Sequence, residues 1–307
     1  MKAVPARSIA ILGALVISFS AIFFRLADVS NTTASFHRPF LALPVLFAIA
    51  FAQHQRGRPG RPARERWLTV AAGGMMGIAF IFWNFGIEAL GAGLATVLGN
   101  SQVVFVGLSA WLLHGERPSR AALIGIPVVL LGAMATSGLG GAEAYGSAPL
   151  RGVVFGLANG VTYAAFLVMF RALNRGAGLA AGLLADASLG AALVAAAAGV
   201  LADPGFTLIP EATAAFWLIM AALGPQVVGW LAILYALPRL AALDTSVVLL
   251  LQPVLTVLWA WWLLAETPSA IQLGGVALVL VGVTIVSSFG STKRRTERKA
   301  ADSGGAP

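Results

Sequence analysis

Two glutamines, Gln102 and Gln252, are the first candidates for binding chemistry, because each lies near the middle of a long apolar run. The chain is 59% apolar and only 10% charged, a composition typical of membrane proteins. A polar group within a membrane span is costly, so it tends to face other helices or a wet cavity. An amide can bond to a neighbouring helix, which contributes about 1 kcal/mol, or line a cavity, and both interpretations stay open.

Aromatic residues recur at similar depth. Trp83 and Trp230 align with each other at an offset of 147 residues, and Trp259 lies seven residues after Gln252, on the same helix face. Tryptophan in a span either belongs to the interfacial belt or forms a wall of a cavity. The second interpretation predicts a largely neutral, aromatic-lined site near the midplane, with these substrate-binding residues: Gln102, Gln252, Trp83, Trp230, Tyr163, Asn84, Trp259, Arg38 and His37.

The charged residues at depth are few. His37 and Arg38 open the second apolar stretch, where Arg38 either snorkels outwards or faces the cavity and attracts a carboxylate. Asp186 is the deepest acid and could carry a proton or pair with a polar neighbour. Glu116 and Glu266 precede Pro-Ser pairs, where we expect each carboxylate to complement the N-terminus of the helix that follows.

Several classes of function are disfavoured. The sequence has no cysteine, no HExxH, no P-loop and no GxSxG with a partner histidine. Its three histidines, at 37, 54 and 114, are not spaced as a metal cluster. The formal charge of +8 comes from basic residues at helix ends and tails, without the basic groove of a nucleic-acid-binding protein. We therefore expect no enzyme, no cofactor, no metal and no nucleic-acid partner.

The elements that position these residues are apolar stretches of about 20 residues, each long enough to span a bilayer. The sequence predicts ten: 8–26, 34–54, 67–90, 93–114, 121–138, 150–173, 178–200, 213–236, 240–264 and 269–290. If the N-terminus is cytoplasmic and the spans alternate, 17 lysines and arginines lie inside, while only Arg25 and Arg151 lie outside. This bias predicts that both termini are cytoplasmic.

The chain is also a repeat. Residues 95–133 and 245–283 align without a gap at an offset of 150, which places Gln102 on Gln252 and Glu116 on Glu266. Five spans per half is an odd number, so the second half must be inverted, as in many transporters. The fold class is therefore an all-α integral membrane protein of two inverted five-helix repeats, 1–146 and 147–290. A basic cytoplasmic tail, 291–307, is expected to be disordered.

This doubled pattern, with LLHGERPS at 112–119 and LLAETPS at 263–269, resembles the EamA-type branch of the drug/metabolite transporter superfamily. Arg38 in HRPFLALP also fits, and the resemblance covers residues 8–290. It implies alternating-access transport of small metabolites, similar to amino-acid exporters of the YddG type. Proline after Gln252 follows the family pattern, whereas Val103 after Gln102 departs from it, so a kink is less expected in the fourth span than in the ninth.

Together these features predict a multi-pass carrier of the cell (inner) membrane that exports small amphipathic metabolites, with amino acids as the first choice. One alternative is a drug, nucleotide-sugar or other metabolite exchanger of the same superfamily, although phosphate groups would need more fixed cations than the spans hold. Another is a membrane receptor or assembly subunit without transport. The sequence leaves open the exact substrate, whether transport is coupled to protons, and whether the chain forms a homodimer.

Overall fold

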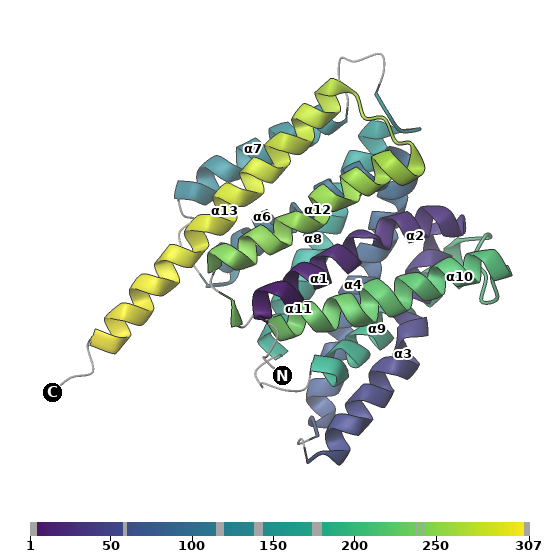
Figure 1. Ribbon diagram of the computed structural model, residues 1–307, viewed down its shortest axis with the longest axis horizontal. Helices are drawn as coiled ribbons and strands as arrows, with labels where there is room; N and C mark the ends of the chain where they lie inside the picture. The colour runs from purple at the N-terminus through teal and green to yellow at the C-terminus, as the bar shows by residue number, and fades with distance from the viewer. Residues whose placement is uncertain are drawn as a thin grey trace.

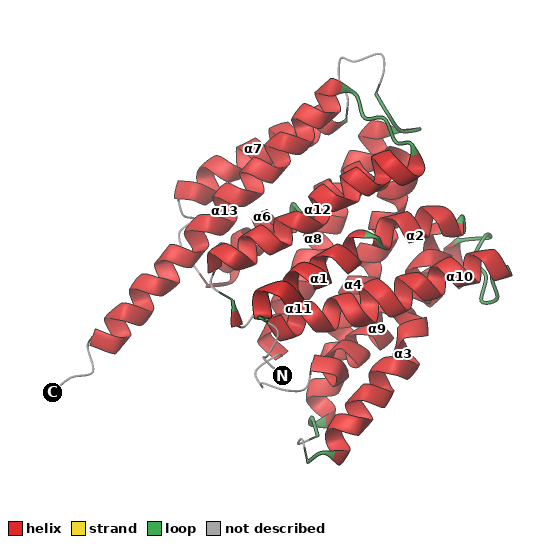
Figure 2. Cartoon of the chain, in the orientation of Figure 1, coloured by secondary structure: helices red, strands yellow, loops and turns green. Residues whose placement is uncertain are grey.

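The computed structural model describes residues 5–57, 60–114, 120–137, 144–173, 180–236, 239–240 and 242–303, and within these ranges every regular element is helical (Figures 1 and 2). In the first half the helices are α1 (Ala6–Ser18), α2 (Ser20–Ala27), α3 (Asn31–Gln55), α4 (Ala63–Leu90), α5 (Ala92–Gly99), α6 (Gln102–His114) and α7 (Arg120–Thr136). In the second half they are α8 (Pro149–Leu173), α9 (Ala180–Ala202), α10 (Ala212–Ala221), the π-helical segment η1 (Ala222–Gly229), α11 (Trp230–Ala236), α12 (Ala242–Leu264) and α13 (Ala270–Ser303).

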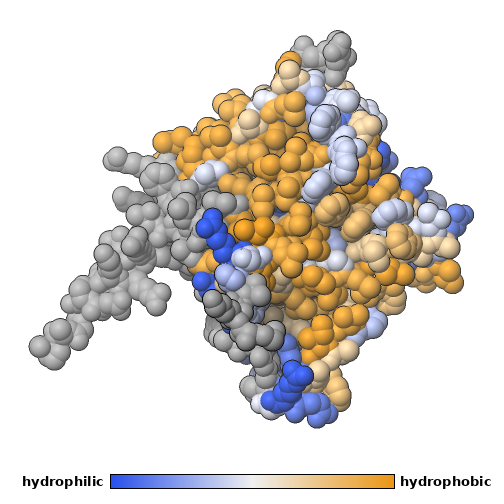
Figure 3. Space-filling model, in the orientation of Figure 1, coloured by the Kyte–Doolittle hydropathy of each residue, from blue (hydrophilic) through white to orange (hydrophobic). Residues whose placement is uncertain are grey.

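Length and apolar composition allow many of these helices to cross a membrane. Seven segments of the described chain are long enough: Ala6–Ala27, Asn31–Gln55, Ala63–Leu90, Ala92–Ser109, Pro149–Leu173, Ala180–Ala202 and Ala212–Ala236. Three shorter apolar helices, Leu123–Thr136, Leu250–Leu264 and Ala270–Val286, lie where the fifth, ninth and tenth spans are predicted. The visible face of the molecule is predominantly apolar, with polar residues gathered toward its edges (Figure 3).

The contact between α7 and α13 shows how the two halves are related. The helices lie side by side along one edge of the bundle (Figure 1), where Gly125 approaches Gly282 and Gly132 approaches Gly275. A Cβ atom on Gly132 would lie 2.8 Å from the carbonyl oxygen of Gly275, so only glycine permits this approach. Because Gly125 and Gly275 are repeat equivalents, as are Gly132 and Gly282, the contact is reciprocal and antiparallel, as a two-fold relation requires.

The other main interfaces follow the same reciprocity. When the two halves are aligned, α8 of the second half is equivalent to α1–α2 of the first, and α10–η1–α11 is equivalent to α4. Helix α8 packs on α4, and α1 packs on η1 and α11. The second and seventh predicted spans, α3 and α9, pack on each other. The contacts between the two halves are therefore reciprocal.

Three predicted spans are interrupted. The first breaks at Phe19 between α1 and α2, the fourth breaks at Asn100 and Ser101, and the eighth passes through η1, which contains Pro225. The expectation for the fourth span was wrong, because it breaks without a proline, whereas α12 continues through Pro253 as one helix. The Asn100 side chain donates to the carbonyl oxygen of Thr96 at 2.9 Å, so a local side-chain hydrogen bond competes with the helical pattern there.

The tail prediction was also wrong. Helix α13 continues to Ser303 through most of the segment that we expected to be disordered. Its Lys, Arg, Glu and Ala residues are good helix formers, and the preceding apolar helix supplies the nucleus that an isolated segment would lack.

Candidate functional site

Arg38 lies in the interior of the bundle, with 3% of its surface exposed. Helix α3 directs its guanidinium inwards, where Nε donates to Gln226 Oε1 at 2.9 Å and one terminal nitrogen donates to Ser20 Oγ at 2.7 Å. Both acceptors are neutral, and no acidic side chain among the described residues forms an ion pair with Arg38. In this structure Arg38 does not snorkel to the surface.

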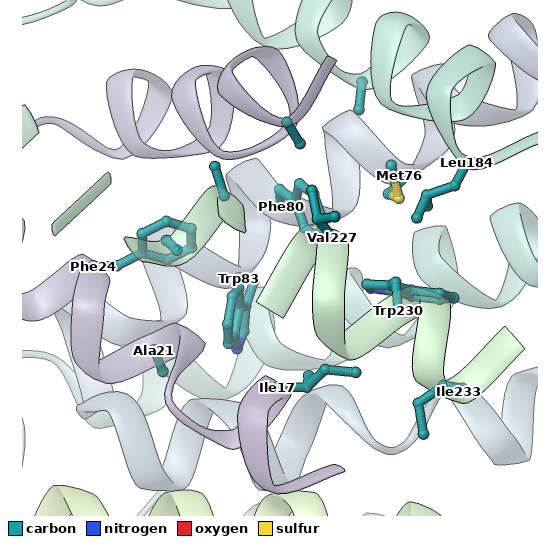
Figure 4. Close-up of a cluster of buried hydrophobic side chains, with 14 of the residues drawn as sticks. Ile17, Ala21, Phe24, Met76, Phe80, Trp83, Leu184, Val227, Trp230 and Ile233 are labelled. Atoms are coloured by element: carbon teal, nitrogen blue, oxygen red, sulfur yellow. The ribbon is translucent and has the colours of Figure 1, made fainter. Parts of the chain in front are cut away.

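Aromatic rings surround this cation. The guanidinium carbon lies 4.5 Å from the centroid of Phe80, 5.9 Å from that of Trp83 and 6.0 Å from that of Phe24. Figure 4 shows Phe24, Phe80 and Trp83 around one region of the buried cluster. Trp83 is 7% exposed, so the belt interpretation does not hold for it.

Gln226 reaches Arg38 because the π-helical segment η1 turns it inwards. Its side chain is fully buried, and its Nε2 donates to Ser188 Oγ on α9 at 3.0 Å. Neither Gln226 nor Ser20 is among the site residues predicted from the sequence. Two features of the sequence could have indicated these residues: Pro225, next to Gln226, and the serines on both sides of Phe19. Both mark irregular helix segments, which often lie at the binding sites of membrane transporters.

A second aromatic group lies on α8 and α11. The ring of Tyr163 is 6.4 Å from that of Trp230 and 5.5 Å from that of Phe166. Trp230 is 9% exposed, so it too is buried, and it appears in Figure 4 with Val227 and Ile233 of the same span. The two aromatic groups belong to one continuous cluster of buried apolar side chains, against which Tyr163 also packs.

Two further predicted site residues make local or structural contacts. The Nδ1 atom of His37 lies 2.9 Å from the Thr33 carbonyl oxygen, and its Nε2 lies 3.3 Å from the carbonyl oxygen of Leu208 in the loop after α9. The Asn84 amide donates to Ser35 Oγ and to the Phe80 carbonyl oxygen, both at 3.0 Å. Asn84 thus joins α4 to α3 beside Arg38.

Trp259 lies at the break in the first span. Its indole N–H donates to Ser18 Oγ at 2.9 Å, and its ring stacks on Phe19 with centroids 4.9 Å apart. Thr256, on the same helix, donates to the Ser18 carbonyl oxygen at 3.0 Å. These contacts satisfy polar groups that the break frees.

The two glutamines that opened the sequence analysis are both half-buried. Gln102 begins α6 directly after the break in the fourth span, and Gln252 lies inside α12 one turn before Thr256. Within the described residues no hydrogen bond joins their two amides. The structure brings Arg38, Trp83, Tyr163 and Trp230 together, but it does not pair the glutamines.

Two acidic residues contact partners that the sequence did not specify. Asp186 forms ion pairs with Arg61, between α3 and α4, at 2.9 Å and with Arg66, in the first turn of α4, at 3.1 Å. This favours a structural role over a free proton carrier. Burial lowers the pKa of Arg61, and the nearby carboxylate of Asp186 partly offsets this effect.

Glu266 caps a different helix from the expected one. Its carboxylate accepts from the backbone N–H groups of Ala92 at 2.6 Å and Gly93 at 3.1 Å, at the N-terminus of α5 and not of α13. Burial raises the pKa of this carboxyl group, and the two N–H groups partly oppose that rise. The positive φ of Ala265 helps turn the chain back so that Glu266 reaches α5. Its counterpart Glu116 lies outside the described residues.

A pocket of about 520 Å³ lies between the α2–α3 turn and the loop before α10. Asp28, Ser30, Thr207 and Glu211 are among its lining residues. Within the described part of the chain, no group of three or more His, Cys, Asp or Glu side chains is placed to hold a metal ion.

The chain matches the model of the EamA-like transporter family twice, over residues 5–138 and 150–288. No curated protein matches it. Twenty-four chains of solved structures do, and one, described as "Crystal structure of protein", is similar at a TM-score of 0.62 and 18% identity. That similarity covers 92% of this chain and 98% of the other, and at such low identity it concerns the fold alone.

Proposed function

Because this chain belongs to the EamA-like transporter family, we propose that it exports small amphipathic metabolites, amino acids first among them, by alternating access through a central cavity. The inner membrane of the cell is the proposed location, with ten spans and both termini in the cytoplasm. The reciprocal antiparallel packing of the two halves supports this proposal, because inverted repeats give a carrier two related conformations around one midplane site.

The observation that carries the proposal is the environment of Arg38. A buried cation with neutral hydrogen-bond partners and aromatic neighbours has a full positive charge to offer an incoming carboxylate. The rings of Phe80, Trp83 and Trp230 offer apolar walls for a side chain. A carboxylate joined to an apolar group is the ligand that suits both features.

A counterflow screen in proteoliposomes tests the proposal, with labelled amino acids, purine metabolites, nucleotide sugars and cationic drugs. We expect amino acids to exchange, and Arg38→Ala to lower their flux about tenfold or more, because a hydrogen-bonded charge is lost. Arg38→Lys should also impair flux, since lysine lacks the planar fork that bonds Gln226 and Ser20 together.

Arg151→Ala is the matched control. Arg151 is also near an aromatic ring, at 5.3 Å from the centroid of Phe155, but it is exposed and lies at the beginning of α8. Its substitution should leave flux unchanged. Normal amino-acid flux in Arg38→Ala would refute the assigned role of Arg38.

A further inference from the structure

The break between α5 and α6 leaves polar atoms without partners in the interior. Ser101 is fully buried, and its hydroxyl forms no hydrogen bond with the described residues. Across the break, Asn100 N–H bonds back to Thr96 and Val97, and Ser101 N–H bonds to Leu98. Among the described residues, the Gly99 carbonyl accepts none of these bonds, so the C-terminal end of α5 presents a free oxygen.

Helix α8 closes the other side of this break. Asn159 is 7% exposed, and its Nδ2 atom would lie 2.5 Å from a Cβ placed on Gly99. A Cβ on Gly160 would lie 2.3 Å from Ser101 Oγ, so glycine there lets α8 approach the serine hydroxyl. The amide nitrogen of Asn159 thus faces the backbone of Gly99 across the interface between α8 and α5.

Contacts with the rest of the fold hold α5 in place as a separate half-helix, so the break is a stable feature of the structure. All eight of its residues are buried, and the Glu266 carboxylate fixes its N-terminus. The carbonyl groups at its other end carry the negative end of the helix dipole toward the break. Neutral oxygens at a helix C-terminus, away from acidic side chains, suit a small monovalent cation.

The break is also connected to Arg38 along α8. Gly160, which touches Ser101, lies three residues before Tyr163 and is therefore its neighbour on the helix surface. Tyr163 in turn packs against the same buried aromatic cluster as Phe80, whose ring lies 4.5 Å from the Arg38 guanidinium carbon. A ligand at this site could thus reach a cation at one end and unpartnered oxygens at the other.

We infer that the α5–α6 break binds the ammonium group of a zwitterionic substrate through the Gly99 carbonyl and Ser101 hydroxyl oxygens. This deepens the proposed function and rests on it: Arg38 takes the carboxylate, the break takes the amine, and the side chain lies against the aromatic rings. A free sodium ion could bind the same oxygens, so the test distinguishes the ammonium group of a substrate from a sodium ion.

The test compares phenylalanine with 3-phenylpropionate, which has the same ring and carboxylate but no amine. Affinities of purified protein for both compounds are measured by thermal-shift titration, and flux is measured in sodium or choline buffer. Ser101→Ala removes one hydroxyl that has no partner, so the fold should be retained. We expect it to weaken phenylalanine binding about tenfold and to leave 3-phenylpropionate binding unchanged.

Ser109→Ala is the matched control, because Ser109 lies on α6 and its hydroxyl already donates to the Val106 carbonyl oxygen at 2.7 Å. It should change neither affinity. Asn159→Asp, which places a carboxylate at the break, should strengthen phenylalanine binding and weaken 3-phenylpropionate binding.

If Ser101→Ala affects the binding of both ligands equally, or of neither, the ammonium site is refuted. Amino-acid flux by the wild-type protein would in that case still support the proposed function. A requirement for sodium that disappears in Ser101→Ala would assign the break to the ion and overturn the inference. If the wild type moves no amino acid, the proposed function and the inference are both refuted.

Discussion

Arg38 can remain charged in the interior without an acidic partner. An arginine at the centre of a span costs roughly 2.5–3.5 kcal/mol on insertion scales. Hydrogen bonds from a charged group contribute about 1.5–3 kcal/mol each, and a desolvated cation–π contact about 2 kcal/mol. The bonds to Gln226 and Ser20, with the ring of Phe80 at 4.5 Å, are therefore enough to offset the cost. A carboxylate from a ligand would then add net attraction.

Trp230 should control which side chains the site accepts. Trp230→Ala enlarges the space beside Tyr163, so we expect bulky amino acids to gain severalfold over small ones in competition for flux. Such a truncation can cost about 3–5 kcal/mol of stability, so Trp230→Phe is measured beside it and should give a smaller shift in the same direction. Trp261→Ala, at a residue 63% exposed, should leave the preference unchanged. An identical ranking of substrates in all three variants would contradict a wall at Trp230.

Sequence reasoning at this scale found the buried groups and not their partners. Arg38, Trp83 and Trp230 stood out because a charge or an indole at depth is unusual, and all three are buried. Ser20 and Gln226 did not, because their contact with Arg38 depends on a helix break and a π-helical turn in spans distant in sequence. Gln102 and Gln252 stood out through the repeat, but symmetry alone does not determine side-chain direction.

At the scale of elements, the irregular helices are the least predictable feature. Apolar length identified where helices form, since a span must satisfy its backbone internally. Proline was a poor guide to where they break: α12 continues through Pro253, and the fourth span breaks where Asn100 bonds to Thr96. The capping of α5 by Glu266 was likewise missed, because it joins segments that are 174 residues apart.

The loop between α9 and α10 is held to α3 by Asp203, which accepts from the Thr32 hydroxyl. Burial raises the pKa of Asp203, but hydrogen bonds from Thr32, Ser30 and Gly205 outweigh this and lower it below its ordinary value of 3.8. A lowered folded-state pKa means that this contact stabilises the protein above pH 3.8 and is lost as pH falls through the folded-state value.

A spin label on Ile209→Cys should therefore become more mobile on acidification below pH 3.8, since Ile209 lies in this loop and is exposed. With Asp203→Asn in addition, the label should be mobile at neutral pH and change little with acid. A label that responds to acid equally with and without Asp203 would rule out this carboxylate as the cause.

At the scale of the molecule, the inverted repeat predicts on which side of the membrane each loop lies. The chain has no cysteine, so single cysteines report without background. We expect Ser147→Cys to react with an impermeant reagent from outside and Arg56→Cys only after permeabilisation, because both residues are exposed and lie at opposite predicted sides. Ser119, a further inner position predicted from the sequence, lies outside the described residues. The reverse labelling pattern would refute the proposed orientation.

The repeat itself could be predicted from the sequence, because the alignment at an offset of 150 has no gap. It also pairs the glycines that lie in the contact between α7 and α13. The family matches over 5–138 and 150–288 confirm that the chain contains two such units. The substrate could not be predicted in the same way, since the neutral aromatic site that we propose would admit many side chains and few charges narrow the choice.

Counterflow of an amino acid tests the central claim most directly. Proteoliposomes of the wild-type protein are loaded with unlabelled phenylalanine and diluted into a trace of labelled phenylalanine. A carrier with one site that faces each side in turn should accumulate label transiently above its equilibrium level, and empty liposomes should not. Label that rises only to equilibrium, as through a pore, or that does not enter at all would contradict alternating-access transport of amino acids by this protein.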